Sequence, residues 1–103
     1  MFRQGDVLLV PAGDIDLTKA VPNKKMVKGL KVVLAEGEVT GHSHTMTIET
    51  TTPLLFGGKE IVVVEEPTPL QHQEHGEIEV SPGVYWVTIQ REYTPQAIRR
   101  VID

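Results

Sequence analysis

The chain of 103 residues contains no cysteine. This absence excludes disulfide bonds, thiolate metal sites and a cysteine nucleophile in one step. Serine is almost as scarce, because Ser43 and Ser81 are the only two, and neither stands in a context typical of a serine nucleophile. No glycine-rich phosphate loop is present. The common nucleophilic and nucleotide-binding chemistries therefore have no support in the sequence.

Long apolar runs and an excess of positive charge are also missing. The longest runs, residues 7–10 and 61–64, fall far short of the roughly 20 apolar residues that span a bilayer. The first residues lack the apolar stretch of a secretory peptide. We therefore expect a cytoplasmic protein without membrane contact. Ten Lys and Arg against fourteen Asp and Glu give a net charge of -4, which makes nucleic acid an unlikely partner.

Aromatic residues make up only 5% of the chain, so the core must consist mainly of Val, Ile and Leu. The β-branched side chains among these favour strands. Gly and Pro divide them into short segments, a pattern typical of many short strands joined by tight turns. We therefore predict an all-β single domain over residues 1–103, either a small β-barrel or a β-sandwich. The expected strands are residues 5–10, 29–35, 42–50, 53–56, 60–66, 77–81 and 84–92.

We make separate predictions for three segments that lie between or after these strands. The Gly57-Gly58 pair can supply positive φ between two apolar runs, which predicts a tight hairpin. Residues 14–28 show no clear period and are expected to form an irregular excursion or a short helix with a loop. Thr94 as N-cap and Pro95 at the first helical position predict a short C-terminal helix.

The first of two histidine pairs, His42 and His44, lies on an expected strand. Because side chains alternate along a strand, both share a face with Met46 and Ile48, which is the core side. The opposite face is uniformly polar and is expected to meet water. Two imidazoles in this pattern can give a divalent ion two cis nitrogen ligands, can hydrogen-bond to carboxylates, or can line a wet pocket.

The second pair, His72 and His75, follows two prolines and precedes Gly76, which favours a compact loop or a single turn. We predict that the two pairs converge and bind a divalent transition metal through His42, His44 and one or both of His72 and His75. Imidazole ligands suit zinc, nickel, iron or copper alike.

Whether the predicted site is catalytic depends on its coordination. With an open position, the ion could polarise a small-molecule substrate or activate water, with Glu74 or Glu38 as base. Four nitrogen ligands would instead close the site and make it structural. Glu49 is a further carboxylate near the first pair, but it reaches the histidines only if the chain turns after His44.

Part of the chain resembles the cupins. Gly37, His42, His44 and Glu49 are similar to the first cupin motif, and residues 78–85 look like the second. The resemblance implies a jelly-roll barrel that holds a metal through three histidines and a glutamate. The chain departs from the second motif, because Trp86 stands where its histidine is wanted.

Three short blocks carry a second resemblance. Residues 3–9, 37–44 and 90–93 (RQGDVLL, GEVTGHSH and QREY) are similar to small uncharacterised proteins of bacteria and phages. No activity follows from this likeness.

The alternative to a metal site is a non-enzymatic interaction module. In that case the histidines satisfy local hydrogen bonds, and a protein partner binds at an exposed strand edge or at residues 11–28. A homodimer is compatible with either hypothesis, because small barrels with exposed strands often dimerise.

Overall fold

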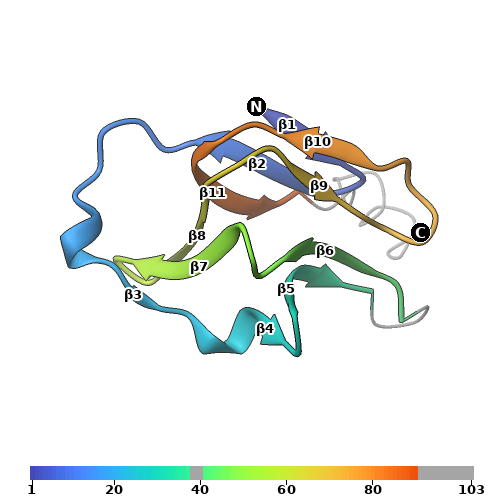
Figure 1. Ribbon diagram of the computed structural model, residues 1–103, viewed down its shortest axis with the longest axis horizontal. Coiled ribbons are helices and arrows are strands. Elements are labelled where there is room, and N and C mark those ends of the chain that lie inside the picture. The colour runs from blue at the N-terminus through green and yellow to red at the C-terminus, as the bar shows by residue number, and fades with distance from the viewer. Residues whose placement is uncertain (38–40, 91–103) are drawn as a thin grey trace, which may run out of the picture.

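Glycine turns separate several of the strands of this protein. The computed structural model describes residues 1–37 and 41–90, which form an all-β domain with two short 3-10 helices, η1 (Leu17–Lys19) and η2 (Lys24–Met26) (Figure 1). Between β7 and β8, Gly57 and Gly58 have φ of 59° and 80°. Positive φ at both central residues is the condition of a type I′ hairpin turn, so the predicted hairpin is confirmed.

The larger sheet is antiparallel throughout and has the order β1-β2-β11-β8-β7-β3. Its strands are β1 (Phe2–Gln4), β2 (Val7–Pro11), β3 (Val21–Pro22), β7 (Thr51–Phe56), β8 (Lys59–Val64) and β11 (Gly83–Ile89). The hairpin of β1 and β2 turns at Gly5 and Asp6, because Gln4 pairs with Val7. This turn lies at the end of the sheet that bears the histidine pocket described below.

Two smaller sheets lie against this one. The first has the order β4-β5-β6, with β4 (Val27–Lys28), β5 (Lys31–Glu36) and β6 (Ser43–Thr47), and the second pairs β9 (Thr68–Leu70) with β10 (Ile78–Val80). An isolated antiparallel bridge joins Thr45 to Gln71, with both N–H···O distances at 2.9 Å. The bridge brings β6 next to the loop between β9 and β10 (Figure 1).

The core is aliphatic, as the scarcity of aromatic residues predicts. Buried side chains from all three sheets make up one cluster, and Tyr85 is its only aromatic member among the described residues. The fully buried members include Val7, Leu9, Val32, Val62, Leu70 and Val80. Met46 joins them from β6, so the expected core side of the histidine strand does face the core.

Several boundaries differ from the sequence prediction. The expected strand at residues 5–10 begins at Val7, and residues 2–4 form a strand that was not predicted. The expected strand at 42–50 ends at Thr47, and residues 48–50 form a turn. Its polar face does not meet water throughout, because Thr45 pairs with Gln71 and is only 7% exposed. β3, β4 and β9 were also missed.

The predictions of a closed barrel and of a C-terminal helix have different outcomes. The described strands form three open sheets, and a closed barrel or a cupin fold is not shown. Residues 14–28, expected to form an excursion or a short helix with a loop, contain two 3-10 helices and the strands β3 and β4. The expected helix after Thr94 and the end of the strand at 84–92 lie outside the described residues. No helix within residues 1–37 and 41–90 has the length and apolar character needed to cross a membrane.

Candidate functional site

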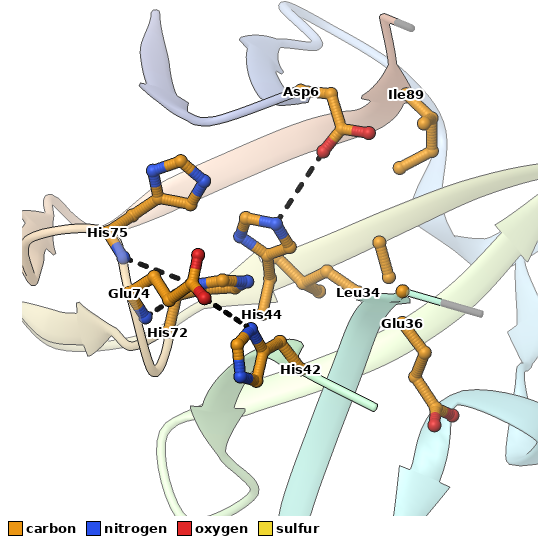
Figure 2. Close-up of a pocket in the computed structure, with 11 residues that line it drawn as sticks. Asp6, Leu34, Glu36, His42, His44, His72, Glu74, His75 and Ile89 are labelled. Carbon is orange, nitrogen blue, oxygen red and sulfur yellow. Dashed lines mark hydrogen bonds and ion pairs between the residues drawn. The ribbon is translucent and has the colours of Figure 1, made fainter. Parts of the chain in front are cut away.

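All four histidines line one pocket with a cavity volume of about 480 Å³ (Figure 2). The ring centroid of His72 lies 4.3 Å from that of His44, 4.6 Å from that of His75 and 5.5 Å from that of His42. His44 comes from β6, whereas His72 and His75 come from the loop between β9 and β10. The structure therefore brings the two sequence pairs together.

His44 is the innermost of the four and is only 5% exposed. Its Nδ1 lies 2.8 Å from Oε1 of Gln4, a side chain of β1 that is itself 3% exposed. The amide nitrogen of Gln4 donates to the backbone oxygens of Leu70 and Gly76, at 2.8 Å and 2.9 Å. One side chain thus links β1 to the histidine of β6 and to both ends of the histidine loop.

This network determines which nitrogen of His44 carries the proton. Backbone carbonyls can only accept, so the Gln4 amide must present its N–H groups to Leu70 and Gly76 and its oxygen to His44. The His44 Nδ1 must then donate. In the neutral ring, the lone pair is left on Nε2.

The Nε2 of His44 faces a carboxylate. Oδ1 of Asp6 lies 3.6 Å away, in the turn between β1 and β2 (Figure 2). Burial of the imidazole, together with its neighbour His72, lowers the pKa of His44 to about 4, although Asp6 acts in the opposite direction. At neutral pH the His44 ring is therefore uncharged, and two electron-pair donors point at each other without a hydrogen between them.

His72 has the opposite tautomer and a different role. Its Nδ1 accepts hydrogen bonds from the backbone N–H groups of Glu74 and His75, at 3.0 Å and 3.2 Å. Nδ1 is therefore unprotonated, and the neutral ring carries its hydrogen on Nε2. Burial, together with His75 and His42, lowers the pKa of His72 and favours this neutral form. His72 thus closes the turn that places His75 in the pocket.

His75 stacks on His44, with an interplanar angle of 17° and 5.8 Å between ring centroids. Both rings lie against Gly5, whose φ is +58°. A Cβ at this position would lie 2.7 Å from Nε2 of His75 and 3.3 Å from Cε1 of His44. The backbone conformation therefore favours glycine here, and a Cβ would in addition displace the His75 ring.

His42 and Glu74 form the more exposed rim of the pocket. Nδ1 of His42 lies 3.3 Å from Oε1 of Glu74, and the exposed fractions of these side chains are 28% and 66%. Glu74, a candidate base from the sequence, therefore lies at the pocket. Glu38, the other candidate, lies outside the described residues, and Glu49 is not among the residues that line the pocket.

The sequence analysis missed the contribution of the first hairpin. Gln4, Gly5 and Asp6 reach the histidines because this turn packs over them, and only the RQGD block marked these residues as distinctive. A Gly-Asp pair between two apolar segments is a turn signal that could have located the bend. Within the described residues, no three His, Asp or Glu side chains already stand in an arrangement that could hold a metal ion.

Comparison with known proteins identifies a family but no function. No curated protein and no solved structure matches the chain. A family model described as a domain of unknown function (DUF8820) matches residues 3–90, which include the turn of the first hairpin and all four histidines. The chain therefore belongs to the DUF8820 family.

Proposed function

We propose that the histidine pocket binds a divalent transition-metal ion, with His44 and Asp6 as its first two ligands. The observation that carries this proposal is the pair of electron donors, the Nε2 of a buried neutral imidazole and a carboxylate oxygen, that face each other at 3.6 Å. A cation between them would satisfy both. Nδ1 of His44 donates to Gln4, as the second nitrogen of a metal-binding histidine usually donates to a neighbouring acceptor.

The separation of the two atoms suits a small ion. Nitrogen and oxygen ligands lie about 2.1 Å from zinc, so two ligands of a tetrahedral ion are about 3.4 Å apart. The observed 3.6 Å between His44 and Asp6 differs from this value by a few tenths of an ångström. An ion could therefore enter with little movement of either side chain.

The remaining ligands require side-chain rotation. His75 is one candidate, because its ring stacks on that of His44 and its Nε2 lies beside Gly5, next to Asp6 in the chain, and His42 can turn inward from the rim. His72 is the least suited, because its Nδ1 is engaged with two backbone N–H groups that order the loop. We therefore assign His44, Asp6 and His75 as protein ligands, with His42 or water in the fourth position. This donor set suits zinc, nickel, iron or copper.

The test is the metal content of untagged protein purified without chelator. Elemental analysis should find about one ion per chain, because each chain has one such pocket among its described residues. His44→Ala and Asp6→Asn should lose the ion. Glu77→Ala is the matched control, because this exposed carboxylate contacts Gln71 outside the pocket. Metal-free protein that also fails to take up added Zn²⁺ or Co²⁺ would overturn the proposal and favour the interaction module.

A further inference from the structure

The pocket is larger than a metal ion needs. Its volume of about 480 Å³ lies within the range of roughly 300–1,000 Å³ that is typical of sites for small organic ligands. A structural ion closed by four protein ligands leaves no such space, whereas an ion with an open position has room beside it for a ligand.

The wall opposite the histidine loop carries aliphatic side chains beside Glu36. Leu34 and Ala35 of β5 and Ile89 of β11 line it, and Figure 2 shows Leu34 and Ile89 across the pocket from His75. The pairing of β5 with β6 shifts register between Val33 and Ala35. At this irregularity the consecutive residues Leu34 and Ala35 both line the pocket. The site therefore has one wall of metal-ligating groups and, on the opposite wall, an apolar patch of three aliphatic side chains beside Glu36.

The charges of the pocket restrict what can bind there. Its described lining contains the carboxylates of Asp6, Glu36 and Glu74 and no lysine or arginine. Glu36 is paired with Lys28, and Glu74 lies at the rim, where its side chain is 66% exposed to water. An anionic ligand thus finds no fixed cation in the lining and can be held only through the metal. A divalent ion with the Asp6 carboxylate keeps one positive charge, which matches one negative charge on a ligand.

We propose that the metal-loaded pocket binds a small organic monoanion. Oxygen atoms of the ligand occupy the open position on the ion, and its short aliphatic body lies against Leu34, Ala35 and Ile89. This inference rests on the proposed metal site and adds the class of ligand that the site takes.

Alkyl hydroxamates are suitable probes, because they bind metals as oxygen-donor monoanions and can be lengthened one methylene at a time. The cobalt-loaded protein is titrated with aceto-, propiono-, butyro- and hexanohydroxamate while its visible absorption is recorded. Burial of each added methylene should tighten binding by up to about fourfold, which is 0.8 kcal/mol per CH₂, until the apolar patch is covered. Isothermal titration should detect no binding of any of them to protein stripped of metal with EDTA.

Two variants test where the aliphatic body of the ligand lies in the pocket. Ile89→Thr should reduce the gain per methylene, so that hexanohydroxamate loses more affinity than acetohydroxamate. Ala35→Leu should narrow the pocket and weaken hexanohydroxamate selectively. Val21→Thr is the matched control for Ile89→Thr, because Val21 is a 54% exposed aliphatic residue outside the pocket.

The possible results distinguish the proposal about the ligand from the proposal about the metal site. Cobalt uptake with hydroxamate affinities that are independent of chain length would overturn the ligand class and leave the metal proposal intact. Equal binding of hydroxamates to metal-free protein would also overturn it. Failure to take up cobalt would overturn both proposals together.

Discussion

Replacement of Gln4 by leucine should damage both the fold and the site, because one buried amide serves three partners. The substitution removes the hydrogen bonds to the backbone oxygens of Leu70 and Gly76 and to Nδ1 of His44. A buried polar group that loses its partner costs about 1–3 kcal/mol. Leu70 O and the His44 ring are buried, whereas Gly76 O is partly accessible to water. We therefore expect Gln4→Leu to lower the free energy of unfolding by about 2–4 kcal/mol.

The same substitution should weaken metal binding, because Gln4 fixes the tautomer of His44. Loss of such a supporting hydrogen bond typically reduces metal affinity about 10- to 100-fold. Urea denaturation gives the stability, and isothermal titration with Zn²⁺ gives the affinity under conditions where the variant is folded. Gln71→Leu is the matched control, because its exposed amide contacts only Glu77 among the described partners, and its stability should change by less than about 0.5 kcal/mol. A Gln4→Leu protein as stable as Gln71→Leu, with unchanged zinc affinity, would refute the role of this network.

Three further predictions follow from the pocket. Gly5→Ala should lower the free energy of unfolding by more than Gly29→Ala does. Both glycines have positive φ (+58° and +62°), but only a Cβ at Gly5 would meet side chains. Equal losses of stability in urea denaturation would show that only the backbone conformation matters. The free energy of unfolding of the metal-free protein should fall by up to about 3 kcal/mol as pH is lowered from 6.5 to 4, because the unfolded chain takes up a proton that folded His44, with a pKa of about 4, does not. Urea denaturation at several pH values measures this, and His44→Gln should flatten the dependence, whereas an unchanged slope would contradict the low pKa. Asp6→Asn should lower the pKa of His44 further, since the carboxylate raises it, and an NMR titration that found a higher pKa would exclude the contact.

The sequence predicted those parts of the structure that depend on local signals. The Gly57-Gly58 hairpin follows from the need for positive φ at both turn positions, and the strands follow from β-branched runs between Gly and Pro. The common direction of His42 and His44 toward one pocket follows from the period of two in extended backbone.

The parts that could not be predicted depend on contacts between distant segments. The sequence suggested that Thr45 faces solvent, but the bridge to Gln71 buries it. No local sequence pattern predicts this pairing. The participation of Gln4 and Asp6 depends on how the first hairpin packs over residues that lie about forty and seventy positions later in the chain. Composition and periodicity do not carry such information, since they describe only which face of a strand is apolar.

The tautomers of the histidines could not be predicted from the sequence either. They follow from which backbone groups donate and accept around each ring, so that His44 carries its hydrogen on Nδ1 and His72 carries it on Nε2. This difference distinguishes an imidazole that offers a lone pair to the pocket from one that orders a loop. The sequence had suggested His42 and His44 as ligands with one or both of His72 and His75, and it gave no means of distinguishing the two within each pair.

The most direct test of the metal site is the long-range ¹H–¹⁵N spectrum of the histidine side chains during titration with Zn²⁺ at pH 7. Metal-free protein should show His44 as the neutral tautomer with its hydrogen on Nδ1, because Gln4 accepts it. Zinc should shift the Nε2 resonance of His44 and leave its Nδ1–H in place, and Asp6→Asn should prevent the change at the same zinc concentration. A His44 Nε2 resonance that stays unshifted at zinc saturation, or that carries a proton in the metal-free protein, would contradict the proposed site.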